Sequence, residues 1–217
     1  MKKTYAAPLL AAVLLVAPAV HAATSTDPVG DFIPTYTGPH GGDLDVVSST
    51  VSYNAATDMF TFSGTMNAAM GTTPGSFYVW GVDRGAGVAS FASLGTGYPN
   101  ILFDTVVILR ADGTGAAAGT ALPAGTVQLN GDTISASFSG ALLPTKGLAK
   151  ADYTWNLWPR AGGVAGNAAI SDFAPDGTNL AVTAVPEPST FALLGLGLLF
   201  VSRRAVVRGR ADRQDKS

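Results

Sequence analysis

Apolar and polar side chains alternate with a period of two through most of the body of the chain. Residues 47–53 place apolar side chains, beginning with Val47, on one face and Ser or Thr on the other. The polar segment 54–58 reads as a turn, and residues 60–66 repeat the alternation. This pattern is typical of strands with one buried face, so it predicts an antiparallel hairpin.

The rest of the body continues in short strands separated by turns rich in Gly, Asp and Asn. Residues 101–110 are apolar on both faces, which predicts a central strand. Asn130-Gly131 predicts a tight hairpin, because both residues tolerate a positive φ. Residues 141–152 offer at most a short helix. The other predicted strands are 77–83, 125–129, 133–139, 153–158 and 180–185. The fold class predicted is all-β, an antiparallel β-sandwich or jelly roll, with long loops at 84–99 and 160–178.

Charge is sparse in this body and is mostly acidic. Between Ala23 and Val185 the chain holds five basic and twelve acidic residues, a net charge of −7. Nucleic-acid phosphates require patches of Lys and Arg, so we expect no nucleic-acid partner. The chain has no Cys, which excludes thiol catalysis, disulfides and thiolate metal sites.

The first residues have the features of an export signal. Two lysines precede the apolar segment 6–20, and the sequence VHA ends at Ala22. Small residues at the −3 and −1 positions predict cleavage between Ala22 and Ala23, so that residues 1–22 form a secretory signal peptide. The alternative is an uncleaved signal anchor, which the short, proline-interrupted apolar segment disfavours.

The other end of the chain reads AVPEPSTFALLGLGLLFVSRR, residues 184–204, and holds the only glutamate, Glu187. Pro186 and Pro188 flank Glu187 and favour an extended, exposed tripeptide. The apolar segment 190–202 predicts a hydrophobic helix that is a marginal membrane span. The arginines after it predict a cytoplasmic tail, because basic flanks stay inside. A buried core helix is the alternative, and six basic residues after it make that helix improbable.

This combination closely resembles the PEP-CTERM sorting signal of Gram-negative bacteria. The resemblance implies recognition by an exosortase, a membrane-embedded cysteine transpeptidase-like protease, after transient anchoring in the inner membrane. It also implies removal of the tail and delivery to the cell surface or extracellular matrix. The tail continues for thirteen residues after the arginine pair, longer than usual for the family. The residues that carry the resemblance are Val185, Pro186, Glu187, Pro188, Ser189 and Thr190, the apolar run 191–201, and Arg203 with Arg204.

The chain is thereby divided into four parts. Residues 1–22 are the signal peptide and residues 23–183 the predicted β-sandwich. Residues 184–210 form the sorting signal, and residues 211–217 a basic and polar tail.

Aspartates are the main candidates for metal chemistry in the body. Asp27 and Asp31 lie in DPVGDF, and Asp43 and Asp45 in GGDLDV. Loop carboxylates suit Ca²⁺, so these four side chains form a candidate calcium site and no other cofactor is expected. The pattern resembles the opening of secreted β-sandwich modules of the carbohydrate-binding type. The alternative is that each Asp forms an ordinary Asx turn.

Histidine and tryptophan supply the remaining candidates. His40 is the only His after signal removal, and its Gly-rich loop shows no nucleophile elbow, so we expect an exposed loop residue. Trp155 and Trp158, in YTWNLWPR, are candidates for a glycan site, since exposed aromatics stack on sugar rings. The alternation also allows the opposite reading, with Trp155 in the core and Trp158 on the other face.

The sequence therefore predicts a non-enzymatic, surface-targeted protein associated with exopolysaccharide or biofilm. One alternative is a secreted polysaccharide hydrolase that uses paired Asp residues. The other is an adhesion module without a sugar ligand.

Overall fold

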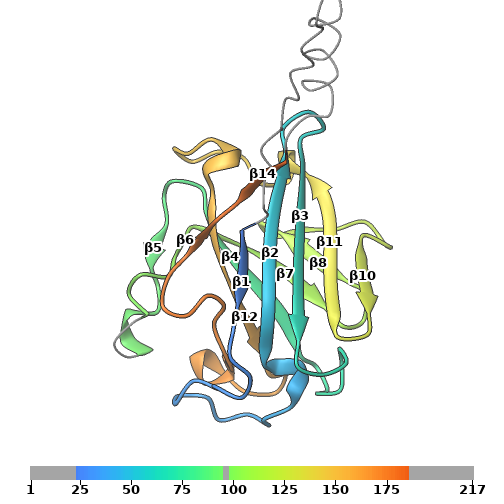
Figure 1. Cartoon of the computed structure of the whole chain (residues 1–217), viewed down its shortest axis with the longest axis vertical. Helices are drawn as coiled ribbons and strands as arrows, with labels where there is room; N and C mark the ends of the chain where they lie inside the picture. The colour runs from blue at the N-terminus through green and yellow to red at the C-terminus, as the bar shows by residue number, and fades with distance from the viewer. Residues whose placement is uncertain (1–22, 95–97, 186–217) are drawn as a thin grey trace, which may run out of the picture. The chain divides into compact units, whose positions relative to one another are not determined.

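A computed structural model describes residues 23–94 and 98–185 of the chain (Figure 1). These residues form an all-β domain whose sheets are antiparallel apart from one short parallel pair, and whose only helical segments are 3-10 turns. The 3-10 turns are η1 (Gly42–Leu44), η2 (Ala92–Leu94), η3 (Gly140–Leu142), η4 (Lys150–Asp152) and η5 (Gly166–Ala169).

Two six-stranded sheets make up the domain. Sheet A has the order β1 (Thr24–Thr26), β2 (Val46–Asn54), β3 (Met59–Met66), β11 (Thr133–Ser139) and β10 (Val127–Asn130), with β14 (Thr183–Val185) also paired to β2. Sheet B has the order β13 (Leu180–Ala181), β12 (Thr154–Arg160), β4 (Phe77–Asp83), β7 (Thr105–Arg110), β8 (Gly115–Ala117) and β9 (Thr120–Ala121). A small hairpin joins β5 (Val88–Ala89) to β6 (Leu102–Phe103).

The facing sides of the two sheets share one hydrophobic core. The predicted hairpin of β2 and β3 is confirmed, and its alternation buries one face as expected. The buried indole N–H of Trp80, in sheet B, donates to Ser49 Oγ of sheet A at 3.0 Å. This hydrogen bond crosses the core and satisfies the indole nitrogen of Trp80. The largest buried side chains of this inner core are Phe60, Phe62, Tyr78, Trp80, Tyr153 and Trp155.

One detail of β2 differs from the predicted alternation. The pairing with β3 shifts between Val46 and Ser48, so Val47 is an extra residue in the ladder. Val46 is fully buried, whereas Val47 is only half-buried. A β-bulge of this kind rotates the strand by one residue, which simple period-two counting does not anticipate.

The central strands of sheet B, β4 and β12, are buried on both faces. The outer face of sheet B carries a second hydrophobic cluster, called here the outer core, around Val79 and Trp158. Three cover loops, residues 27–44, 84–104 and 161–178, contribute the other members of this cluster. The buried side chains from these loops are Ile33, Tyr36, Leu44, Phe91, Ile101, Ala161, Ile170 and Phe173.

Two predicted strands are divided in the structure. Residues 101–110 split at Asp104, because its carboxylate accepts hydrogen bonds from the Arg84 backbone and side chain. Residues 180–185 also split, since β13 pairs with sheet B and β14 with sheet A. The segment before the sorting signal therefore crosses from one sheet to the other.

Both ends of the described chain lie on the same edge of β2. β1 pairs antiparallel to β2, with Thr24 opposite Thr50, and β14 pairs parallel to it further along, with Thr183 opposite Ser52. The backbone N–H of Ala23 donates to Thr183 Oγ1 at 2.6 Å. The first residue after the predicted signal cleavage thus contacts the strand that leads into the sorting signal.

The predicted signal peptide and the predicted hydrophobic helix at 190–202 lie outside the described residues, as do Pro186, Glu187, Pro188, Ser189, Arg203 and Arg204. Within residues 23–94 and 98–185, no helix has the length and apolar character needed to cross a bilayer.

Candidate functional site

Five aspartates from separate segments gather beside the cover loops. Asp27 and Asp31 follow β1, and Asp45 lies between η1 and β2. Asp172 and Asp176 come from the cover loop that precedes β13. We call these five side chains the acidic cluster.

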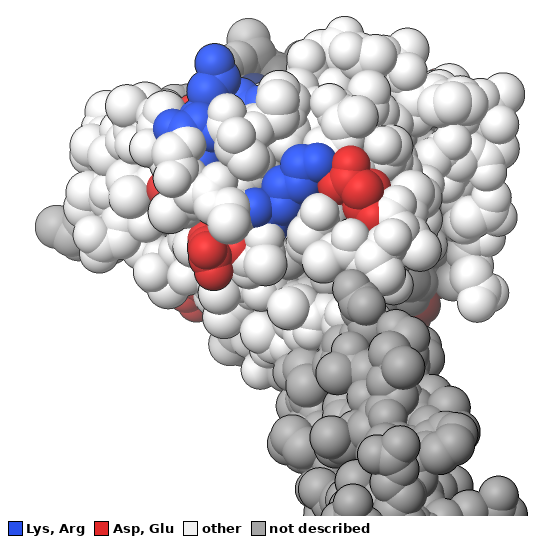
Figure 2. All heavy atoms as spheres, turned by 90° about the horizontal axis from the view of Figure 1, so that it is seen from above, with Lys and Arg blue, Asp and Glu red and all other residues white. Residues whose placement is uncertain are grey.

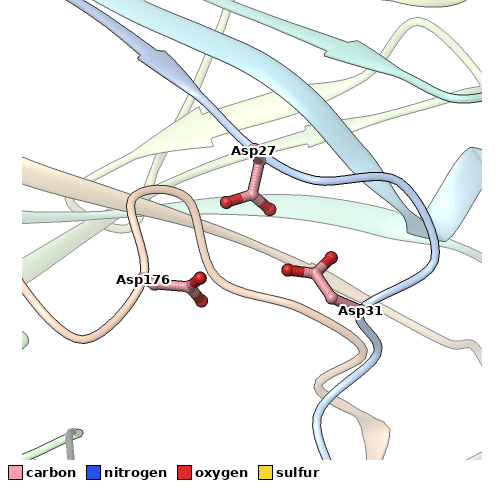
Figure 3. Close-up of side chains that lie close together, drawn as sticks. All are labelled: Asp27, Asp31 and Asp176. Atoms are coloured by element: carbon pink, nitrogen blue, oxygen red, sulfur yellow. The ribbon is translucent and has the colours of Figure 1, made fainter.

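The carboxylates of the acidic cluster form two overlapping groups of three, each compact enough to hold a cation. Oxygen atoms of Asp27, Asp31 and Asp176 all lie within 4.8 Å of one another, and so do those of Asp31, Asp45 and Asp172. Figure 3 shows the first three side chains pointing toward one another from two different loops. Asp31 belongs to both groups and therefore joins them.

Backbone donors hold the two most buried carboxylates in place. Asp45 accepts from the N–H of Gly30 with both oxygens at 3.0 Å. Asp172 accepts from the N–H of Val46 at 2.8 Å and from that of Phe173 at 2.7 Å. Asp45 and Asp172 are each 1% exposed, so these bonds fix their positions at the base of the cluster.

Burial and mutual repulsion make the cluster costly to ionise. Burial first, and then the charge of Asp172, raises the pKa of Asp27 to about 9. Burial likewise raises the pKa of Asp172 to about 7, although its two backbone donors oppose the change. The pKa of Asp31 is also raised, by burial and by Asp176 and Asp45. No Lys or Arg of the described chain is among the groups that act on these three carboxyls.

Asp27 has an oxygen without a donor. Its Oδ2 atom is buried and has no hydrogen-bond partner among the described residues. Asp27 and Asp172 are close enough to share a proton, which satisfies one of them when the pair is not fully ionised. When both are ionised they are acceptors only, so a cation is the group that would satisfy them.

The residues present fit Ca²⁺ in ligand type. Calcium takes six to eight oxygen ligands, largely carboxylates and carbonyls from loops. Of the four predicted ligands, Asp27 and Asp31 lie in one group of three carboxylates and Asp31 and Asp45 in the other, and calcium binding stays a prediction. Asp172 and Asp176 were not predicted, although DFAPD repeats the four-residue spacing of DPVGD with a proline in the loop.

Asp43, the fourth predicted ligand, lies elsewhere, and its inclusion in the site was wrong. Its carboxylate is fully buried and accepts from the N–H of Thr73 at 2.7 Å and from Thr73 Oγ1 at 2.6 Å. Ser76 Oγ lies 3.5 Å from the same carboxylate. Asp43 therefore anchors the loop between β3 and β4.

The aromatic candidates are not exposed. Trp155 is fully buried in the inner core, and Trp158 is 2% exposed in the outer core. Neither indole ring is accessible for stacking on a sugar, so the alternative reading, with the two rings on opposite faces of β12, is confirmed. His40 is exposed, as expected, and stacks on Phe32 with ring centroids 4.4 Å apart.

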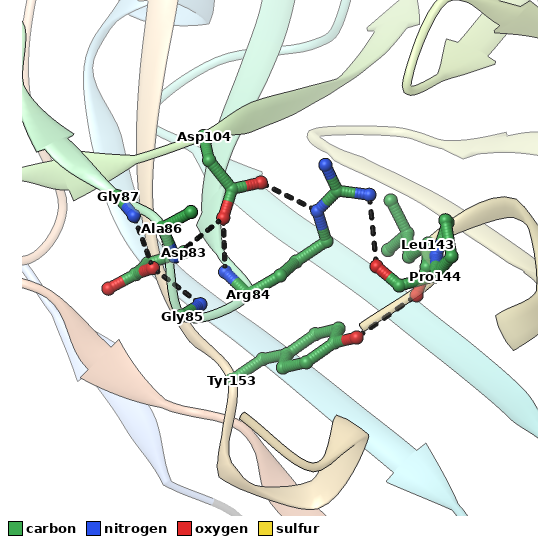
Figure 4. Close-up of polar contacts among 9 residues, drawn as sticks. All are labelled: Asp83, Arg84, Gly85, Ala86, Gly87, Asp104, Leu143, Pro144 and Tyr153. Carbon is green, nitrogen blue, oxygen red and sulfur yellow. Dashed lines mark hydrogen bonds and ion pairs between the residues drawn. The ribbon is translucent and has the colours of Figure 1, made fainter. Parts of the chain in front are cut away.

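A buried ion pair anchors another cover loop. Arg84 Nε lies 2.6 Å from Asp104 Oδ1, and the two side chains are 7% and 9% exposed (Figure 4). Arg84 Nη1 also donates to the carbonyl of Pro144 at 3.1 Å. The pair closes the base of the loop 84–104, and the remaining contacts of both side chains are to nearby backbone groups, which indicates a structural role.

Comparison with known proteins concerns the C-terminal segment. The described residues define an all-β domain that leads directly into the predicted sorting segment. A family model described as the PEP-CTERM protein-sorting motif matches residues 184–208, so the chain carries this motif. The motif marks the protein as exported, targeted to an exosortase, and destined for the cell surface or the extracellular space. No curated protein and no solved structure matches the chain.

Proposed function

We propose that this protein is an exosortase-processed component of the extracellular polymer matrix, with a non-enzymatic β-sandwich that associates with exopolysaccharide. The observation that carries the proposal is the sorting motif at residues 184–208, which begins in β14. Because β14 is paired with β2 as far as Val185, the described domain leads directly into the motif. The two packed sheets and their shared core support the β-sandwich assignment.

Calcium is the second part of the proposal. Ca²⁺ bound by the acidic cluster would compensate the repulsion among Asp27, Asp31, Asp45, Asp172 and Asp176. It would also join two cover loops, residues 27–44 and 161–178, over sheet B. In this role the ion stabilises the domain outside the cell and performs no reaction.

Processing is tested with Glu187→Ala in the native host. The expected result is that full-length protein remains in the membrane fraction, while the wild-type protein reaches the surface without its arginine tail. Asp132→Ala is the matched control, because it removes an exposed carboxylate on the β10–β11 turn and should leave sorting unchanged. Peptides from residues 208–217 on the surface form, detected by mass spectrometry, would contradict the proposal.

Calcium binding is tested by melting the exported protein in Ca²⁺ and in EGTA. A ligand that binds only the folded state stabilises it by mass action, so EGTA should lower the Tm. Asp172→Asn should abolish the difference, whereas Asp43→Asn should preserve it because Asp43 is outside the cluster. Equal melting curves for the wild-type protein in the two buffers would exclude the site.

The enzymatic alternative is polysaccharide hydrolysis by paired Asp residues. It requires two carboxyls that flank an accessible glycosidic bond. Asp45 and Asp172 are too buried for this, which leaves Asp27, Asp31 and Asp176 as the accessible members. Release of reducing ends from the native exopolysaccharide, lost in Asp31→Asn, would favour the hydrolase.

A further inference from the structure

A polar cleft opens at the end of the domain away from the C-terminal end of β14. β14 runs parallel to β2 and ends beside Asn54, whereas the cleft lies among loops next to the start of β2 and the end of β3. The cleft has a volume of about 590 Å³, within the range typical of ligand sites. Its lining residues include Thr73, Gly75, Ser76, Arg110 and Asp112.

Buried contacts fix one wall of the cleft in position. Thr73 and Ser76 are 7% and 5% exposed, and the buried carboxylate of Asp43 fixes this part of the wall. A side chain at Gly162 would clash with the backbone of Gly75, so the cover loop 161–178 also supports the wall. The wall is therefore formed by the fold before any ligand arrives.

Arg110, which lines the cleft, belongs to an unusual arrangement of positive charge whose second arginine, Arg160, is not itself a lining residue. The guanidinium groups of Arg110 and Arg160 each lie 5.8 Å from the ring of Phe77, on three adjacent strands of sheet B. Arg84 and Lys150 form ion pairs, but neither Arg110 nor Arg160 does so with a described residue. In a body with net charge −7, two neighbouring unpaired arginines are a feature that an anionic ligand would explain.

Arg110 also retains its donors. Its guanidinium makes no hydrogen bond to the described chain, whereas Arg160 donates to the carbonyl of Gly166. Asp112 lies next to Arg110 in the lining, and its pKa is lowered by hydrogen bonds from Thr114 and by the charge of Arg110. The cleft thus places the guanidinium donors of Arg110 beside the carboxylate acceptor of Asp112.

We propose that this cleft binds an acidic sugar unit, with the sugar carboxylate on Arg110 and sugar hydroxyls on Asp112 and the glycine backbone of the wall. The planar guanidinium matches a carboxylate in a bidentate geometry. Sugar hydroxyls both donate and accept, which suits a site that combines the Asp112 carboxylate with a glycine-rich wall. The proposal rests on the proposed association with exopolysaccharide and specifies it as binding to a uronate-bearing chain.

The charge of the domain favours a sugar over a nucleic acid. A nucleic acid carries a phosphate at every residue and needs an extended basic surface. Here two arginines are set in an acidic body. Figure 2 looks onto the other end of the domain, away from the cleft, where charged side chains are likewise sparse. One carboxylate per few sugars is the charge density that a single arginine fork matches.

The test uses the full chain in mild detergent at fixed Ca²⁺, with calorimetric binding of tri-galacturonate and of its carboxyl-reduced form. Carboxyl reduction and Arg110→Gln should each weaken binding by about tenfold or more, the effect of losing a charge-assisted hydrogen bond. Arg110→Lys, which keeps the charge and loses the fork, should give an intermediate loss. Lys146→Gln is the matched control, because it removes an exposed positive charge away from the cleft and should change binding less than about twofold.

Equal binding by Arg110→Gln and the wild-type chain, or equal binding of the two trisaccharides, overturns the proposal. Tighter binding of a DNA oligonucleotide that Arg110→Gln abolishes also overturns it, in favour of nucleic acid. A pull-down on native exopolysaccharide separates sugar binding by the cleft from association with the matrix. If Arg110→Gln leaves retention unchanged, the proposed binding at the cleft is wrong and matrix association stands. Arg110-dependent binding of tri-galacturonate without retention on the native polymer supports the cleft and contradicts matrix association.

Discussion

The outer faces of the two sheets differ in whether they remain in contact with water. On sheet A, hydroxyls face outward and bond across strands, as in Thr61–Ser137 at 2.8 Å and Thr65–Thr133 at 2.9 Å. On sheet B, the outer face is aromatic and aliphatic and lies under three cover loops. A hydroxyl face can remain in water, whereas an apolar face must be covered.

The cover is also where the unusual chemistry of the domain lies. The loops that bury Phe173 and Ile33 also carry Asp172 and Asp31 into the acidic cluster. The loop 161–178 further supports the wall of the polar cleft through Gly162. Covering sheet B therefore positions the residues proposed to bind Ca²⁺ and sugar.

The largest expected contrast comes from truncating one side chain on each outer face. Trp158→Ala removes a buried ring from the outer core and should lower the free energy of unfolding by about 3–5 kcal/mol. Thr61→Ala, on the exposed face of sheet A, should cost less than about 1 kcal/mol. Urea unfolding at fixed Ca²⁺ measures both. A loss for Trp158→Ala as small as that for Thr61→Ala would mean that the cover is not packed.

A smaller effect is expected from adding one methyl group under the cover. A Cβ at Gly81 would collide with the Trp158 ring and approach Phe103 Cβ at 3.1 Å. Gly81→Ala should therefore cost about 1–3 kcal/mol, the usual cost of overpacking. Ser135→Ala on the hydroxyl face of sheet A is the control and should be near neutral. Near-neutral behaviour of Gly81→Ala would show that the outer core has room.

The smallest expected effect is a pH dependence of the metal-free protein. The pKa of Asp172 is raised to about 7 and that of Asp27 to about 9, so the folded state holds protons that the unfolded state releases near pH 4. Stability should consequently fall as pH rises through this window. Solvent screening at the partly exposed Asp27 reduces the ideal linkage effect. Between pH 5.5 and 7.5 in EGTA we therefore expect the Tm to fall by about 2–4 °C, as ~1 kcal/mol does in a domain of this size.

Calcium should reverse that trend, because the ion binds the deprotonated carboxylates. Asp172→Asn is the control and should flatten the dependence in EGTA. A metal-free Tm that rises over the same interval would mean that the cluster is not strained by its own charge.

The same contrast explains how much of the fold the sequence could predict. Strict alternation predicted β2, β3 and β11, because one wet face and one dry face are visible in the pattern. FYVWGVD and YTWNLW were predicted as strands, but the pattern does not say that loops bury their outer face, nor which loops do so. The split at Asp104 was missed because it depends on Arg84, twenty residues away.

The acidic cluster, likewise, could be predicted from the sequence only in part. Asp27 and Asp31 share a loop, and Asp45 follows soon after, so local sequence was enough to suggest them as ligands. Asp172 is separated from Asp45 by most of the domain, and only the folded cover brings the two together. Asp43 shows the converse, since its neighbour in sequence is in the cluster and its own side chain turns to Thr73.

The central claim is that Ca²⁺ on the acidic cluster holds the cover over sheet B, and amide hydrogen exchange tests it most directly. The exported protein would be compared in excess Ca²⁺ and in EGTA. Removal of Ca²⁺ should speed exchange in the cover loops at residues 27–44 and 161–178, with β3 and β11 of sheet A unchanged. Equal exchange of the cover loops in the two buffers, or equal acceleration throughout both sheets, would contradict the account.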